Sequence, residues 1–129
     1  MKFAAIGGAL ALLAMTTAGF AADYVGGAIK TMEIGGKQVL TDANGMTLYT
    51  FDKDTPGVSN CYDDCAVKWP PLFAADDAKD EGEFTVVTRT DGTKMWAHEG
   101  WPLYLWVKDT APGETTGDMV GNVWHTAIE

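Results

Sequence analysis

Cysteine is scarce in this sequence of 129 residues, which contains only Cys61 and Cys65. Three residues separate them, so the chain has neither a C-x-x-C redox motif nor a C-x-x-C-H haem attachment site. No second pair of cysteine or histidine ligands stands at zinc-site spacing. In an oxidising compartment an isolated pair most simply forms a disulfide, and a spacing of one helical turn brings the Cα atoms within disulfide reach. We therefore predict a Cys61–Cys65 disulfide.

Basic residues are few as well. Nine lysines and arginines stand against eighteen acidic residues, which gives a net charge of −9. Nucleic acids and anionic lipids are bound by basic surfaces, so we expect neither as a partner. Two interpretations of the acidity remain open: a solvated surface that keeps an exported protein soluble, or an attraction for cations and basic proteins.

Long apolar runs are missing, apart from one short stretch near the N-terminus. Lys2 precedes the apolar residues 3–14, and residues 19–21 have the small-x-small pattern of a cleavage site. The stretch is short for a membrane span, which needs about 20 residues. We therefore predict a signal peptide at residues 1–21 and a single domain at residues 22–129. Because no cysteine stands near the cleavage site, we expect no N-terminal lipid anchor, no membrane span and a periplasmic or secreted location.

Motifs of the common hydrolases are absent. The sequence has no G-x-S-x-G, no Ser/His/Asp signature and, once its cysteines are oxidised, no thiol nucleophile. Two carboxylates on equivalent turns are the remaining acid–base candidates, as in glycosidases, but a domain this small rarely encloses a sugar. We therefore expect that the protein is not an enzyme and needs no cofactor.

The candidate metal ligands are two histidines and four methionines of the exported part: His98, His125, Met32, Met46, Met95 and Met119. Imidazole and thioether ligands together suit copper. However, they form no i, i+4 pair and no Met-x-x-Met cluster, and single methionines usually fill gaps in a core. We therefore predict no metal site, and His98 and His125 are the candidates if copper is bound.

One motif is present twice, 55 residues apart. Residues 48–55 (LYTFDKDT) are repeated, with changes, at residues 103–110 (LYLWVKDT). A repeat of this kind is usually one supersecondary unit used twice to close a shared core. We place repeat 1 at about 37–72 and repeat 2 at about 84–128. The same offset relates two further pairs of residues: Gly45 with Gly100, and Trp69 with Trp124.

The two repeats differ at the cysteines. At the offset of 55, Cys61 and Cys65 align with Thr116 and Val120, so only repeat 1 is predicted to carry a disulfide. The cross-link therefore cannot be a feature that both copies need.

Alternating and β-branched runs bounded by turn signals predict an all-β fold, either a small antiparallel barrel or a meander. The expected strands lie at residues 37–40, 47–51, 84–89, 94–98, 102–107 and 122–127. Asn44-Gly45 predicts a hairpin that pairs the first two of these strands, and Asp91-Gly92 is the predicted turn of a second hairpin, between the strands at 84–89 and 94–98. The polar run at residues 76–83 is expected to be the loop between the repeats. One short helix is expected at 61–68, held by the disulfide, and residues 22–31 are expected to be mobile.

In a strand, alternate residues share a face, so the two aromatic residues of each motif copy lie together. The acid three residues later falls in a turn. Its carboxylate either accepts backbone N–H groups or a tyrosine hydroxyl, or it lines a cleft shared by the copies that binds a cationic or ring-bearing ligand. On the second interpretation the binding residues are Tyr49, Phe51, Asp54, Tyr104, Trp106 and Asp109.

Three features in order make the sequence resemble a bacterial family: the doubled Tyr-x-(Phe/Trp)-x-x-Asp, the pattern CxxxCAxxWPPL at 61–72, and GxPLY…PG…VWH from residue 100 to residue 125. The sequence is similar to the "secreted repeat of unknown function" family, also described as predicted lipoproteins with a Yx(FWY)xxD motif. The resemblance covers residues 39–128. It implies an exported envelope protein and brings no established activity. Many members are described as lipoproteins, whereas the missing cysteine favours a soluble protein here.

These observations predict a non-catalytic binding or interaction module of the bacterial envelope. Its partner would be an unknown envelope protein or a small ligand. The alternative is a periplasmic copper-binding or redox-accessory protein. That alternative needs His98 and His125 to converge on one ion, because metal–ligand bonds are only about 2 Å long.

Overall fold

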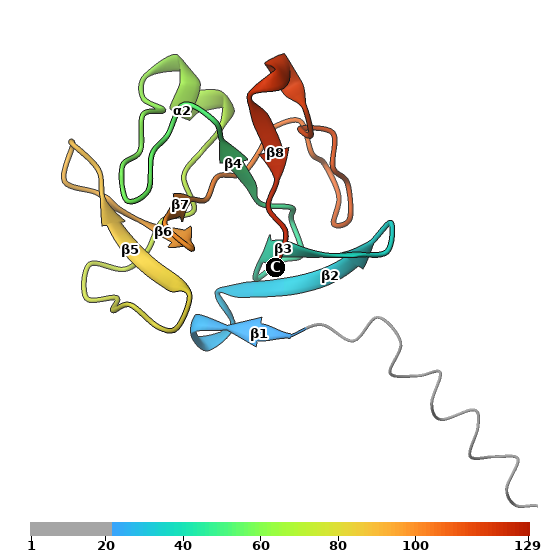
Figure 1. The fold of residues 1–129 in the computed structure, drawn as a ribbon, viewed down its shortest axis with the longest axis horizontal. Helices are drawn as coiled ribbons and strands as arrows, with labels where there is room; N and C mark the ends of the chain where they lie inside the picture. Colours follow the sequence, from blue (N-terminus) through green and yellow to red (C-terminus); the bar gives the residue numbers. More distant parts are fainter. Residues whose placement is uncertain (1–21) are drawn as a thin grey trace, which may run out of the picture.

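The computed structural model describes residues 22–129, so the predicted signal peptide at 1–21 lies outside the described residues. Within residues 22–129, no helix is long and apolar enough to cross a membrane. The chain is mostly β, with antiparallel sheets and little helix (Figure 1). The predicted fold class is therefore confirmed at this level.

Three small sheets make up the domain. The first contains β1 (Asp23–Tyr24), β2 (Ile29–Ile34) and β3 (Lys37–Asp42). The second pairs β4 (Tyr49–Phe51) with β8 (Trp124–Thr126). The third contains β5 (Phe84–Thr88), β6 (Lys94–His98) and β7 (Trp101–Pro102). Among the described residues these sheets do not close into a barrel, so of the two predicted architectures the barrel is not found.

The expected hairpin between residues 37–40 and 47–51 is confirmed only next to its turn, where the N–H of Asp42 donates to the carbonyl of Met46 and the N–H of Leu48 to the carbonyl of Leu40. β3 pairs along its whole length with β2, and β4 pairs with β8 of the other repeat. Residues 22–31, expected to be mobile, form β1, the 3-10 turn η2 (Val25–Gly27) and the start of β2. The physical reason is that β2 offers β3 a longer partner, whose residues Ile29 and Thr31 alternate into the interior.

The predicted helix is shorter than expected. α2 covers Asp64–Lys68, because Asp63 has a left-handed backbone (φ 57°) that interrupts the helix before it. Cys61 and Cys65 form the predicted disulfide, with their Cα atoms 5.3 Å apart. In repeat 2 the 3-10 turn η3 (Val120–Asn122) precedes β8 and carries no cross-link.

The core consists of two apolar clusters, one on each side of the repeated strands. The aromatic side is formed by Tyr49, Phe51, Cys61, Trp69, Val87, Met95, Ala97, Tyr104 and Trp124. The aliphatic side is formed by Ile29, Leu40, Leu48, Phe84, Trp96, Leu103 and Ala127. Neighbouring residues of the motif thus alternate between the clusters, which confirms the predicted strand faces.

Candidate functional site

The repeated motif lies at the centre of the domain, where its two copies exchange polar partners. Tyr49 donates a hydrogen bond to Asp109 Oδ2 at 2.6 Å, and Tyr104 donates one to Asp54 Oδ2 at 2.7 Å. The two tyrosines are also joined through their backbones by reciprocal N–H···O bonds of 2.8 and 2.9 Å. Each tyrosine therefore bonds the acid of the other copy, and the motif holds the two repeats together.

The second aromatic residue of the motif takes part in the same exchange. Four rings stack in the order Phe51, Trp124, Trp69, Trp106, with centroids 4.2, 3.8 and 3.9 Å apart. The two central tryptophans, one from each repeat, are parallel to within 2°. Phe51 covers the tryptophan of repeat 2, and Trp106 covers the tryptophan of repeat 1. The aromatic position of each motif copy thus completes the core of the other copy.

The polar groups of the motif are enclosed. Tyr49 and Tyr104 are fully buried, and Asp54 and Asp109 are 2% and 7% exposed. Within the described part of the chain, no buried side-chain nitrogen or oxygen lacks a hydrogen-bond partner. This geometry supports the interpretation in which the acids bond tyrosine hydroxyls. Ligand binding by the six motif residues stays a prediction.

The acids also define which residues of the two repeats are equivalent. Asp54 Oδ1 accepts the backbone N–H of Asn60 at 2.7 Å, and Asp109 Oδ1 accepts that of Thr116 at 3.0 Å. Thr116 is therefore the counterpart of Asn60, and Gly117 is the counterpart of Cys61. The alignment of Cys61 with Thr116 was wrong by one residue, because the turn of repeat 2 contains one extra residue before its Pro-Gly.

Gly117 has no space for a side chain. A Cβ there would lie 2.9 Å from both Tyr49 Cζ and Trp69 Cη2. We expect Gly117→Ala to lower the free energy of unfolding by about 1–3 kcal/mol, because both rings belong to the packed core. Urea unfolding measures this change. Val67→Ala, at an exposed site of α2, is the control, with an expected change within about 0.5 kcal/mol. An unchanged midpoint for Gly117→Ala would contradict the packing described here.

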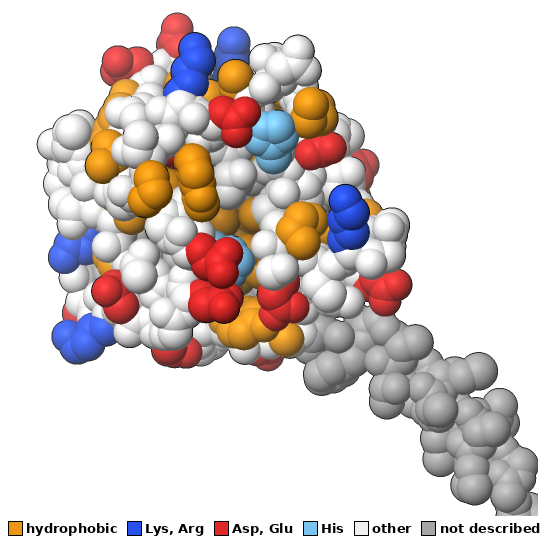
Figure 2. Space-filling model, in the orientation of Figure 1, with side chains coloured by type: hydrophobic (Ala, Val, Ile, Leu, Met, Phe, Trp, Pro, Cys, Tyr) orange, Lys and Arg blue, Asp and Glu red, His pale blue; other side chains and the backbone are white. Residues whose placement is uncertain are grey.

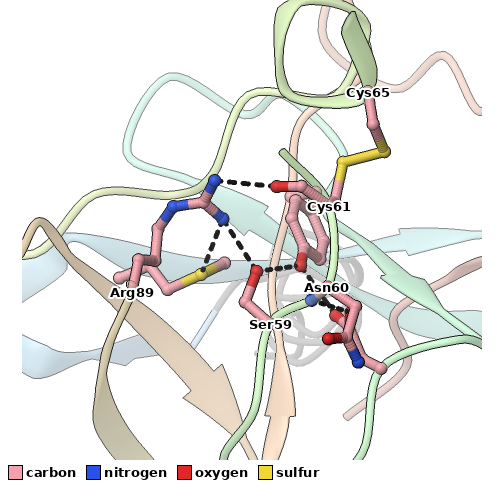
Figure 3. Close-up of a disulfide and its surroundings, with 8 residues drawn as sticks. Ser59, Asn60, Cys61, Cys65 and Arg89 are labelled. Carbon is pink, nitrogen blue, oxygen red and sulfur yellow. Dashed lines mark hydrogen bonds between the residues drawn. A yellow bond between two sulfur atoms is a disulfide. The ribbon is translucent and has the colours of Figure 1, made fainter. Parts of the chain in front are cut away.

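A chain of hydrogen bonds links a buried cation to Asp54, and Figure 3 shows its beginning at Arg89 and Ser59. Arg89 is 4% exposed and donates 2.7 Å bonds to Ser59 Oγ and to the carbonyl of Cys61. Because Tyr104 gives its proton to Asp54, the 2.6 Å bond between Ser59 and Tyr104 has Ser59 as donor. The guanidinium charge is thus connected to the carboxylate through two hydroxyl groups.

Burial governs the protonation of these groups. It raises the pKa of Tyr49 well above its ordinary value, with the bond to Asp109 acting in the same direction, and it also raises the pKa of Tyr104. Burial raises the pKa of Asp54 too, while the bond from Tyr104, the Asn60 N–H and the charge of Arg89 lower it. The tyrosines therefore remain neutral hydrogen-bond donors, which suits a structural role.

Two of the solvent-facing hollows adjoin each other at the end of β5 and β6. A groove of about 610 Å³ is lined by Tyr24, Glu81, Gly82, Glu83, Phe84, Glu99 and Glu129. A smaller pocket of about 230 Å³ is lined by Thr50, Asp52, His98, Glu99, Trp101, Thr126, Ala127 and Ile128. Glu99 borders both hollows. Figure 2 shows acidic side chains gathered beside histidine on this face.

One histidine lies at the border between the groove and the pocket. His98 is 6% exposed, its Nε2 is 3.1 Å from Glu83 Oε1, and its ring packs against Phe84 with centroids 4.9 Å apart. Glu83, His98 and Glu99 each present one possible ligand atom, and these atoms all lie within 4.8 Å of one another. This mixed donor set is able to bind a metal cation.

The second histidine belongs to a separate pair. His125 Nε2 lies 2.8 Å from Asp52 Oδ2, and its side chain is 36% exposed. In residues 22–129, no group of three histidine, cysteine or acidic ligands contains both histidines. The structure therefore gives each histidine its own carboxylate, and the convergence of His98 and His125 that the copper alternative requires is not seen among these residues.

Sequence reasoning missed the acids of this region. Glu81 and Glu83 were assigned to a polar loop, and Glu99 was not considered. A signal was nevertheless present, because the predicted hairpin of residues 84–98 puts residue 83 beside residue 99. In the structure Phe84 lies opposite His98, and residue 83 therefore lies beside residue 99.

The described residues thus form an antiparallel β domain of two interlocked repeats, with one disulfide and an acidic groove. The chain belongs to the family described as secreted repeat of unknown function, which matches residues 30–73 and 85–128. Each match contains one copy of the motif, and residues 74–84, which include most of the polar loop, lie between the two matches. The family description indicates a secreted protein. Comparison with curated proteins and with solved structures gave no match.

Proposed function

We propose that this domain is a non-catalytic binding module of the periplasm or the external medium, and that its groove takes a cationic ligand. The observation that supports this most is the lining of the groove. Four glutamates, Glu81, Glu83, Glu99 and Glu129, border one hollow together with the rings of Tyr24 and Phe84.

Carboxylates and aromatic faces both attract positive charge. Exposed acids gathered in a concave site raise the local concentration of cations, and a ring face adds a favourable contact with a cation placed over it. The overall charge of −9 acts in the same direction at long range. A groove of about 610 Å³ has the size of a small-ligand site.

The centre of the domain supports binding without catalysis. Its tyrosine hydroxyls and acids are buried and bonded to one another, so their role is to hold the repeats together. The exposed end of β5 and β6 is therefore the part that we propose contacts a ligand. It belongs to a hairpin whose strands contribute Phe84, Val87 and Met95 to the core.

The test is a nuclear magnetic resonance titration of the ¹⁵N-labelled protein with spermidine and, separately, with Zn²⁺. We expect saturable shifts with at least one probe, at the amides of Tyr24, Gly82, Phe84 and Glu99. The triple variant Glu81→Gln, Glu83→Gln, Glu99→Gln should lose them.

A matched control removes three exposed acids that line neither hollow. Glu33→Gln, Asp63→Asn and Asp64→Asn together change the net charge equally and should leave the groove shifts in place. Neither probe shifting these amides, or both triple variants losing the shifts equally, would contradict the proposal.

A further inference from the structure

We propose that Glu83, His98 and Glu99 form a site for a divalent first-row transition-metal ion at the border of the groove. This inference rests on the proposed function, because it names the cation that the groove takes. The ligand atoms of the three residues already lie within 4.8 Å of one another. It uses His98 alone and not the pair of histidines that the sequence offered.

The spacing is close to what one ion needs. Nitrogen and oxygen ligands stand about 2.0–2.2 Å from zinc, so two ligands of one ion are at most about 4.4 Å apart. His98 is held by its burial and by Phe84, whereas Glu83 and Glu99 are exposed. A small rotation of either glutamate therefore closes the site around a fixed imidazole.

The backbone places the three ligands on one rigid edge. Phe84 of β5 pairs with His98 of β6, and the backbone N–H of Glu99 donates a 2.8 Å bond to the carbonyl of Glu83. This bond joins the positions from which the two carboxylates extend. Sites built on paired strands hold their ligands more firmly than sites on free loops.

Glu99 occupies a backbone conformation that does not suit it. It begins the two-residue turn between β6 and β7 with φ 51°, followed by Gly100 with φ 89°. Such turns normally have Asn, Asp or Gly at the first position, because other residues are strained there. Repeat 1 has Asn44 at the corresponding position of the offset, but its φ is not positive, so the strained position belongs to the turn of repeat 2. A glutamate at this position has a longer side chain, which extends its carboxylate towards His98.

The donor set indicates the class of metal. Two carboxylates and a neutral imidazole balance the charge of a divalent ion, and imidazole favours zinc or copper over magnesium and calcium, which prefer oxygen ligands. Three protein ligands leave at least one coordination position open. The adjoining hollows hold two further acids, Asp52 in the smaller pocket and Glu129 in the groove.

The deciding experiment is a competition titration. The purified protein is first treated with a chelator, and Zn²⁺ is then partitioned between the protein and a chromogenic zinc chelator. We expect one ion per chain, with no competition from millimolar Mg²⁺. His98→Gln and Glu99→Gln should each weaken binding by about tenfold or more, because even loss of an outer partner of a metal ligand costs about 10–100-fold.

His125→Gln is the matched control, since it removes an imidazole bonded to a carboxylate outside the triad. It should bind zinc like the parent protein. Because His98 is buried and its replacement affects folding as well, Glu99→Asn provides an independent measure. Asparagine suits the left-handed turn, so this variant should melt a few degrees higher and still lose the ion.

The outcomes separate this inference from the proposed function. Unchanged zinc affinity in Glu99→Gln, or an equal loss in His125→Gln, overturns the triad. If zinc does not bind while spermidine still shifts the groove amides, the triad is wrong and the cation groove stands. If neither probe binds, both proposals are wrong.

Discussion

Trp124→Ala is expected to lower the free energy of unfolding by about 3–5 kcal/mol, the usual cost of removing a buried aromatic side chain. Trp124 is 4% exposed and lies between Phe51 and Trp69 in the ring stack. It also meets Tyr104 edge to face, with centroids 5.2 Å apart. One substitution therefore removes two aromatic contacts that join the repeats and a third within repeat 2. A domain of this size has only about 5–15 kcal/mol of stability in total.

The measurement is urea unfolding followed by far-ultraviolet circular dichroism, with the near-ultraviolet spectrum recorded in parallel. Trp101→Ala is the control, because Trp101 is also a tryptophan of repeat 2 but is 37% exposed. Its loss should be much smaller, and its near-ultraviolet spectrum should keep the contribution of the stacked rings. Equal losses for Trp124→Ala and Trp101→Ala would show that the stack does not hold the repeats together.

Much of the fold is readable from the sequence, because local patterns decide it. The alternation of Leu48 and Tyr49 assigns them to opposite clusters. The β-branched run and the Asp91-Gly92 turn predict the hairpin that β5 and β6 form. These features depend on residues that are neighbours in the chain, where steric rules and side-chain periodicity operate.

The exchange between the repeats was not readable in the same way. The sequence offered a tyrosine hydroxyl as one partner of each motif acid, but not that Tyr49 would bond Asp109, 60 residues away. Such pairing depends on how two units dock. The pairing of β4 with β8 was not predicted for the same reason, since the Asn44-Gly45 turn signal indicates only the local hairpin, which forms next to the turn.

The candidate site lies between these cases. His98 was a candidate ligand because of its imidazole. Glu83 and Glu99 become candidates only because the pairing of β5 with β6 places them beside His98. Single acidic residues near turns are common, so their spacing in the chain gives no signal. Glu83 and Glu99 come close to His98 only because the paired strands β5 and β6 end there.

Arg89→Met is expected to lower the free energy of unfolding by about 3 kcal/mol or more. This loss comes from contacts of Arg89 that have no counterpart around Asp109 of the other motif copy. The substitution leaves the carbonyl of Cys61 without its guanidinium donor and removes the cation that is linked to the buried carboxylate of Asp54. Each buried polar group left unsatisfied costs about 1–3 kcal/mol, and an uncompensated buried charge costs more. Lys108→Met, which removes an exposed cation, is the control and should change the stability by about 0.5 kcal/mol or less.

The pH dependence of the stability loss in Arg89→Met distinguishes the loss of the charge of Arg89 from the loss of its packing. Burial raises the pKa of Asp54, so the folded state holds this proton more tightly than the unfolded chain does. The resulting contribution to stability is fully present below the unfolded pKa and is lost as the pH rises through the folded pKa. Without Arg89, which opposes this shift, the pKa of Asp54 rises further. The deficit of Arg89→Met relative to the parent protein should therefore shrink between about pH 7 and about pH 4.

Asp54→Asn on the Arg89→Met background completes the argument. Neutralising the carboxylate removes the uncompensated charge, so the double variant should be more stable at neutral pH than the sum of the two single losses predicts. Its deficit should also no longer depend on pH in that range. Additive losses and a deficit that is constant with pH would instead mean that Ser59 and Tyr104 carry no coupling between the cation and the acid. Asp109 accepts hydrogen bonds from the hydroxyl of Tyr49 and the N–H of Thr116, whereas Arg89 of repeat 2 is linked to Asp54 of repeat 1, and this experiment isolates that link.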